Sequence, residues 1–141
     1  EYLKTDALRK TLVSQREVYL QNVMEVVKIE LQNSGINVIN VHGREKTLYS
    51  LYRKIISHGG WDSAEQIYDV VAIRIIVDNL SDCYAALGII HKLWRPLKGR
   101  IKDYISQPKP NGYQSLHTTV FCIDGQIVEF QIRDRSMHDE A

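Results

Sequence analysis

Several features are scarce in this chain of 141 residues. Its two cysteines, Cys83 and Cys122, are far apart and form no Cys-x-x-Cys pattern, so the sequence predicts neither a disulfide framework nor a zinc site. The longest apolar run, over residues 70–77, contains Arg74 and is too short to span a bilayer. A net charge of +1 argues against a generally basic protein that coats nucleic acid.

No secretory signal opens the chain, and its first residue is Glu1, not Met. We therefore expect a piece excised from a longer, multidomain protein of the cytoplasm. With 44% hydrophobic and 25% charged residues, the composition is that of an ordinary globular domain. We expect residues 1–141 to form a single domain, with an N-terminal helix over residues 1–35 and a sheet with further helices over residues 36–141.

Hydrophobic periodicity and turn residues predict the order of the helices and strands. Helices are expected over residues 5–33, 46–56, 81–95 and from 136 onward, and strands over residues 36–41, 70–77, 114–123 and 126–134, with a short strand near residue 104. Asp124-Gly125 is a strong two-residue turn signal and predicts that the last two strands form a hairpin. This order predicts an α+β fold, with a mixed sheet of about five strands flanked by helices.

Two of the helices have an apolar stripe that predicts their buried face. The stripes are Leu12, Tyr19, Val23 and Val26 in the first helix, and Tyr84, Leu87, His91 and Trp94 in the third. Ser81 is expected to cap the third helix. His91 is expected to be structural, and Trp94 to anchor the core.

Basic residues between Lys92 and Lys109 are the most informative feature that is present. They are Lys92, Arg95, Lys98, Arg100, Lys102 and Lys109, against the single acid Asp103. Because the whole chain is nearly neutral, this local patch favours a small anionic ligand over a long polyanion. Tyr113 follows in a Pro-x-Pro-Asn-Gly context, where an exposed ring can stack on a base. The alternatives are a tyrosine packed on the core and, at His117, a histidine satisfied within the sheet. The stretch predicts a site for a polyanionic nucleotide.

The last strand alternates between apolar and polar side chains. Val128, Phe130 and Ile132 share one face, and Glu129, Gln131 and Arg133 share the other. The polar face is either a solvated surface or a rigid platform for a carboxylate, as a metal ligand or general base requires. The pattern alone leaves both interpretations open.

Four further candidates also have more than one interpretation. Asp69, directly before the strand over residues 70–77, is either a turn residue or a magnesium ligand. Arg74 needs an acid, a strand end or a ligand cleft, because burying an unpaired guanidinium is costly. Strict alternation puts Asp69 and Arg74 on opposite faces, so a shared site requires a bulge or a bend. Arg44 and Lys46, just before a helix, are either solvated or bind an anion.

These segments match a family pattern when they are taken in order. The matching segments are Gly43-Arg44-x-Lys46, Tyr49-Ser50-Leu51-Tyr52, Tyr68-Asp69-Val70-Val71-Ala72-Ile73-Arg74, Cys83-Tyr84-x-x-Leu87-Gly88-x-x-His91, Trp94-x-Pro96, Gly99-Arg100-x-Lys102-Asp103-Tyr104-Ile105, Pro108-Lys109-x-Asn111-Gly112-Tyr113-Gln114-Ser115-Leu116-His117-Thr118 and Glu129-Phe130-Gln131-Ile132-Arg133. They resemble the synthetase domain of the RelA/SpoT family, in its bifunctional-type branch. The match covers about two thirds of the chain, and its last two segments are highly specific.

The resemblance implies a nucleotidyltransferase-like catalytic sheet that makes the alarmones ppGpp and pppGpp. The reaction would transfer the β,γ-pyrophosphate of ATP to the 3′-hydroxyl of GDP or GTP. The family pattern implies Mg²⁺ on the catalytic residues Asp69 and Glu129, with Glu129 also drawing the proton from the 3′-hydroxyl. It implies ATP binding by Arg44, Lys46 and Arg74, and guanine nucleotide binding by Tyr113, Lys102, Lys109, Asn111, His117 and Gln131.

The family divides at the tetrad that here is Arg100-Ile101-Lys102-Asp103. A basic tetrad resembles the bifunctional branch, with a leaning to GDP and a single magnesium ion. The chain lacks the hydrolase's His-Asp motifs, so we expect hydrolase and regulatory domains elsewhere in the parent chain. It departs from the family at Thr47, where histidine is usual, and at Asp134, where threonine is usual.

Two other functions stay open at this point. One is a catalytically silent module that binds guanine and adenine nucleotides and serves regulation. The other is an RNA-contacting domain, which is not expected because the basic patch is interleaved with Gly and Pro and has few aromatic residues. A membrane partner is not expected either.

Overall fold

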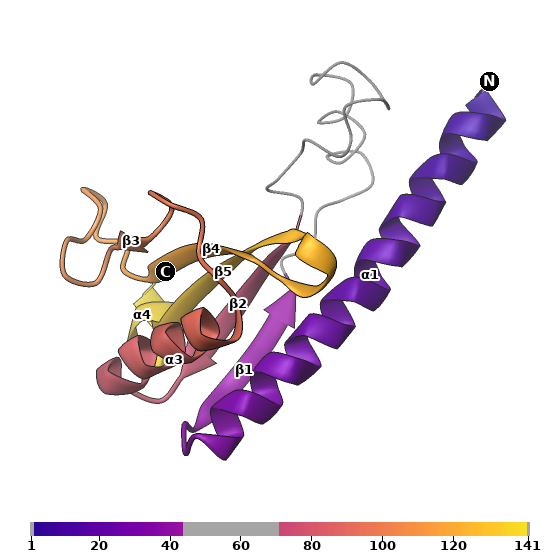
Figure 1. The fold of residues 1–141 in the computed structure, drawn as a ribbon. Helices are drawn as coiled ribbons and strands as arrows, with labels where there is room; N and C mark the ends of the chain where they lie inside the picture. Colours follow the sequence, from indigo (N-terminus) through magenta and orange to yellow (C-terminus); the bar gives the residue numbers. More distant parts are fainter. Residues whose placement is uncertain (1, 44–70, 141) are drawn as a thin grey trace.

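The computed structural model describes residues 2–43 and 71–140 (Figure 1). Its elements are α1 (Tyr2–Asn33), β1 (Val38–Gly43), β2 (Ala72–Val77), α3 (Leu80–Leu93), β3 (Lys102–Asp103), β4 (Leu116–Phe121), the 3-10 turn η2 (Ile123–Gly125), β5 (Ile127–Asp134) and α4 (Arg135–Glu140). These strands form one sheet in the order β1-β2-β5-β4-β3. The β2–β5 pair is parallel and the other pairs are antiparallel. The predicted α+β class and five-stranded mixed sheet are confirmed.

Helix α1 runs along the sheet beside β1 (Figure 1). Its buried side chains are Leu20, Val23, Val27 and Leu31. These positions recur at intervals of three and four, so they form one stripe. The predicted stripe was partly wrong: Val26 is only half-buried. Tyr19 packs against the core and its hydroxyl donates to the Ile123 carbonyl at 2.7 Å. The side chain of Leu12 lies outside the described residues.

The N-cap of helix α3 lies two residues earlier than predicted. The Asn79 side chain accepts a hydrogen bond from the Asp82 amide at 2.9 Å, so Asn79 is the N-cap and the prediction of Ser81 is wrong. The buried residues are Cys83, Ala86 and Ile90. The predicted stripe was therefore displaced by one position. The face that contacts the sheet includes the small side chains of Cys83 and Ala86, which let the helix approach closely. The apolarity of the residues alone does not indicate this choice of face.

The hairpin between β4 and β5 forms at the predicted turn. Asp124 and Gly125 both have left-handed backbone angles, with φ of 58° and 74°. Asp and Gly are residues that adopt such angles readily, and the 3-10 turn Ile123–Gly125 reverses the chain between the strands. The Cys122 amide donates to the Gln126 carbonyl at 2.7 Å and closes the turn.

The apolar side chains of α1 and α3 pack on the same face of the sheet. On that face the ring of Trp94 stacks on Phe130 at 5.9 Å between centroids, as expected of a core anchor. Cys83 and Cys122 are both buried and free, which confirms their role as small apolar side chains. Among the described residues, no helix has the length and apolarity needed to cross a membrane.

Helix α4 follows β5 directly. The Asp134 carboxylate accepts a hydrogen bond from the Met137 amide at 2.9 Å and so caps the helix. Thr and Asp both serve as N-caps through a side-chain oxygen. Asp134, where the family pattern has threonine, therefore serves as the N-cap of α4 in this chain.

Candidate active site

The face of the sheet that α1 and α3 leave uncovered carries a row of polar residues, one from each strand. The strand register aligns His42, Arg74, Gln131, His117 and Lys102 across β1, β2, β5, β4 and β3. Neighbours in such a row have Cβ atoms roughly 4.5–5.5 Å apart. Four of the five were predicted to bind nucleotide, and the row brings these four together from distant parts of the sequence.

Glu129 is held on this face by a chain of hydrogen bonds. Arg74 Nη2 donates to Gln131 Oε1 at 3.4 Å, and Gln131 Nε2 donates to Glu129 Oε1 at 2.7 Å. Gln131 is only 5% exposed, so its amide has little freedom to turn. The carboxylate of Glu129 is half-buried and its orientation is set by Gln131.

Tyr113 and His117 form a second linked group beside the row. The Tyr113 hydroxyl lies 3.0 Å from His117 Nε2 and accepts a hydrogen bond from Ser115 Oγ at 2.9 Å. The Tyr104 ring meets the imidazole edge-on, with centroids 5.2 Å apart. These contacts fix the plane of the Tyr113 ring. Ser115 and Tyr104 were not predicted as site residues, although both lie inside matching motifs.

Lys109 brings a cation to the same two rings. Its Nζ lies 4.8 Å from the Tyr104 centroid and 5.3 Å from the Tyr113 centroid. Asn111 shapes the turn between Lys109 and Tyr113, because its Oδ1 accepts a hydrogen bond from the Tyr113 amide at 3.0 Å. Gly112 has φ of +86°, which favours glycine. The loop therefore presents an aromatic ring and an ammonium group side by side.

Asp103 organises the loop that follows β3. Its carboxylate accepts hydrogen bonds from the Tyr84 hydroxyl at 2.9 Å, from the Ile105 amide at 3.0 Å and from the Ser106 amide at 2.9 Å. Burial raises the pKa of Asp103, but the hydrogen bonds from Ser106, Tyr84 and Ile105 outweigh it and hold the pKa below 3.8. The Asp-x-x-Ser spacing could have revealed the Ser106 contact, whereas nothing local indicates Tyr84. Arg100 and Lys102 stay exposed beside this anchor.

Two arginines and two histidines gather where β1, β2, β5 and α4 meet. Burial is the main cause that lowers the pKa of His42, followed by the charges of Arg74, His138 and Arg133. Arg133 is only 4% exposed, and within residues 2–43 and 71–140 its Nε has no hydrogen-bond partner. Burial and then the charge of Arg74 lower its pKa as well. This end of the row is therefore electropositive. Neither His42 nor Arg133 was predicted as a site residue.

A family model described as a region found in RelA and SpoT proteins matches residues 43–141. The chain belongs to the RelA/SpoT family. It is 52% identical to a GTP pyrophosphokinase of Streptomyces antibioticus over 89% of this chain and 15% of that protein. It is 43% identical to a probable guanosine-3′,5′-bis(diphosphate) 3′-pyrophosphohydrolase of Synechocystis over 100% of this chain and 19% of that protein. The chain thus spans less than a fifth of either relative.

A solved alarmone synthetase has the same fold. The crystal structure of small alarmone synthetase 2 from Bacillus subtilis superposes with a TM-score of 0.68 and 28% identity, over 95% of this chain and 75% of that one. The family resemblance seen in the sequence motifs is confirmed. The hydrolase name of the Synechocystis protein agrees with the bifunctional-type branch that the basic tetrad indicates.

The RelA/SpoT site residues predicted from the sequence fall into three groups. Those on or beside the polar face are Glu129, Arg74, Gln131, His117, Tyr113, Lys109, Asn111 and Lys102. Asp103 pairs with Leu116 and bonds to Tyr84 of α3, so it lies on the other face, and Arg100 is exposed just before β3. Asp69, Arg44 and Lys46 lie outside the described residues. The prediction that Asp69 shares a face with Arg74 therefore stays a prediction. In the described ranges no group of three or more His, Cys, Asp or Glu side chains could hold a metal ion.

Proposed function

We propose that this domain synthesises (p)ppGpp by moving the β,γ-pyrophosphate of ATP to the 3′-hydroxyl of GDP or GTP, with release of AMP. The observation that carries the proposal is the hydrogen-bonded chain from Arg74 through Gln131 to Glu129, which joins an arginine assigned to ATP with a fixed carboxylate. Tyr113 and Lys109, assigned to the guanine nucleotide, lie on the loop beside that chain. The relatives named GTP pyrophosphokinase support the same reaction.

The chemistry suits such a rigid face. A hydroxyl must attack a crowded, highly charged phosphorus atom, so catalysis is mainly positioning and charge neutralisation. Glu129 would take the proton from the 3′-hydroxyl, because its carboxylate is held at a defined angle by Gln131. Arg74 would stack on the adenine together with Arg44.

The guanine nucleotide would bind at the other end of the row. Tyr113 would stack on the base, since its hydroxyl is anchored and its ring cannot turn freely. The groups proposed for its phosphates and ribose are Lys102, Lys109, Asn111, His117 and Gln131. Lys46 would meet the ATP phosphates.

A magnesium ion is the proposed cofactor. Glu129 fits it, because Mg²⁺ prefers carboxylate oxygens and completes its coordination with water and phosphate oxygens. Asp69 is the proposed second ligand. When bound, the ion would neutralise charge on the transferred group.

The partners of the domain are also proposals. The substrates are ATP and GDP or GTP, and the basic tetrad favours GDP. Because the chain spans so little of its relatives, hydrolase and regulatory domains are proposed elsewhere in a cytoplasmic parent protein.

A transfer assay tests the function. The protein is incubated with GDP, Mg²⁺ and ATP labelled in the β-phosphate, and the products are separated. We expect label in a guanosine nucleotide, with AMP formed in equal amount. Binding of both nucleotides without transfer of label would contradict synthesis and support the silent regulatory module.

A further inference from the structure

The last two residues of the basic tetrad have opposite surroundings. Lys102 and Asp103 are neighbours in β3, so their side chains point to opposite faces of the sheet. Lys102 aligns with His117 in the polar row, whereas Asp103 aligns with Leu116, which is fully buried on the side of α3. The lysine therefore lies beside the proposed nucleotide site, and the carboxylate faces helix α3.

Tyr84 connects helix α3 to that carboxylate. Its hydroxyl donates to Asp103 Oδ2 at 2.9 Å and lies 3.0 Å from Ser106 Oγ, which donates to the same carboxylate oxygen at 3.0 Å. Three side chains thus close a ring of hydrogen bonds between the helix and the turn after β3. Tyr84 is 39% exposed, so water could hydrate its hydroxyl. Burial alone therefore does not require this contact.

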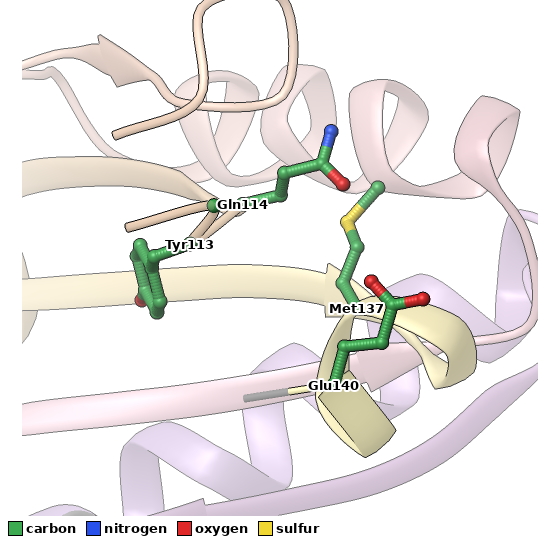
Figure 2. Close-up of a pocket in the computed structure, with 5 residues that line it drawn as sticks. Tyr113, Gln114, Met137 and Glu140 are labelled. Carbon is green, nitrogen blue, oxygen red and sulfur yellow. The ribbon is translucent and has the colours of Figure 1, made fainter. Parts of the chain in front are cut away.

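The turn after β3 also supports the loop that carries Tyr113. Gln114 Nε2 donates to the Ile105 carbonyl at 3.3 Å, and Figure 2 shows the Gln114 and Tyr113 side chains leaving that loop in different directions. The Tyr104 ring meets the Tyr113 ring with centroids 6.3 Å apart and has Lys109 Nζ 4.8 Å from its own centroid. A displacement of this turn would therefore move both the aromatic ring and the ammonium group.

We propose that Tyr84 is a positioning residue for the guanine nucleotide, because its hydroxyl fixes Asp103 and Asp103 fixes the turn that supports Tyr113 and Lys109. This inference rests on the proposed function and adds to it a residue on the other face of the sheet. A loop that is ordered before binding loses less conformational entropy when the ligand binds, so its affinity is higher. Arg74, assigned to ATP, lies on the polar face and takes no part in this ring of hydrogen bonds.

The Tyr84→Phe variant tests this role, since it removes the hydroxyl and keeps the ring. Calorimetry with Mg²⁺ present gives the Kd for GDP, and the transfer assay gives kcat and the KM for each substrate. We expect the Kd and KM for GDP to rise roughly three- to fivefold, as for the loss of one hydrogen bond. The KM for ATP and kcat at saturation should stay near wild type. An unchanged Kd for GDP, or an equal rise in the KM for ATP, would overturn this inference.

Tyr19→Phe is the matched control, because it also removes a tyrosine hydroxyl that joins a helix to a turn, here at the Ile123 carbonyl. It should lower the thermal unfolding midpoint at least as much as Tyr84→Phe and leave the Kd for GDP unchanged. A similar rise in Kd in both variants would reflect a general loss of stability and would overturn the positioning role.

The Asp103→Ala background tests whether Tyr84 acts through Asp103. In that background Tyr84→Phe should cause no further rise in the Kd for GDP, and a further three- to fivefold rise would contradict the inference. Should Asp103→Ala not fold, the comparison of Tyr84→Phe with Tyr19→Phe decides alone. If the wild-type protein bound no GDP at all, the proposed function would fail and this inference with it, whereas GDP binding unaffected by Tyr84→Phe would overturn this inference alone.

Discussion

The two faces of strand β5 differ in polarity, although both contain buried side chains. Val128, Phe130 and Ile132 are fully buried against other apolar side chains. Gln131 and Arg133, on the opposite face, are nearly as buried, at 5% and 4% exposure, yet they are polar. Burial stabilises the first set through the hydrophobic effect and costs free energy for the second unless partners compensate.

The difference shows what each face is for. A sheet that packs on helices needs one apolar face to fold, and β5 has it. On its polar face, the hydrogen bonds that link Arg74, Gln131 and Glu129 offset only part of the free-energy cost of burial. The Arg133 guanidinium has no acid paired with it among the described residues. An anionic ligand on this face would supply the missing compensation.

The largest effect is expected from Glu129→Gln on the polar face. The variant keeps the bulk of the side chain and an oxygen that accepts from Gln131, but it loses charge and proton affinity. Turnover in the transfer assay should fall by about a thousandfold, within the range for loss of a general base. ATP binding and the thermal unfolding midpoint should stay near wild type. Normal turnover would refute the assigned role.

On the apolar face, Phe130→Ala should instead destabilise the fold. It removes the ring that stacks on Trp94 and leaves a cavity in the core, so the free energy of unfolding should fall by about 3–5 kcal/mol. Urea denaturation followed by circular dichroism measures this loss. Gln131→Ala, the neighbour on the other face, is the control and should cost much less stability. Equal losses in both variants would remove the distinction between the faces.

Tyr113→Ala sharpens the comparison within the polar side. Loss of base stacking should weaken guanine nucleotide binding by about 1–3 kcal/mol and leave ATP binding unchanged. Tyr113→Phe keeps the ring without its hydroxyl and should retain most of the affinity. Calorimetric titration with each nucleotide separates the effects. A similar loss for GDP and ATP would count against the stacking assignment.

The smallest effect is expected at Asp103, which only supports the loop. Its pKa is lower in the folded protein than in the unfolded chain, so its stabilising contribution is complete above about pH 3.8 and is lost as the pH falls through the folded value. Hydrogen exchange of the Ile105 and Ser106 amides should accelerate, beyond its intrinsic pH dependence, over that range. In Asp103→Asn this additional change should be absent. Protection that does not respond to acid in the wild type would contradict this role.

Local signals in the sequence were enough for much of the fold. The turn at Asp124-Gly125 and the alternation along β5 each depend on a few neighbouring residues, and both were confirmed. The cap and buried stripe of α3 were wrong, because Asn79 and Ser81 are both good caps and only packing on the sheet decides between the stripes.

The assembly of the site depends on the register between neighbouring strands, which no short stretch of the sequence predicts. His42 meets Arg74 across a strand pair, and Tyr84 meets Asp103 from a helix. The family resemblance named Arg74 and Asp103 without their partners. The contact between α4 and the loop that carries Tyr113 joins segments about 25 residues apart, and no local pattern indicates it.

The central claim is that the polar face of β5 brings a guanosine 3′-hydroxyl to Glu129. A crystal structure of the protein with GDP, Mg²⁺ and a non-hydrolysable ATP analogue tests it most directly. We expect the 3′-oxygen within hydrogen-bonding distance of the Glu129 carboxylate and the guanine stacked on Tyr113. Two ordered nucleotides with the 3′-oxygen remote from Glu129 would contradict the account.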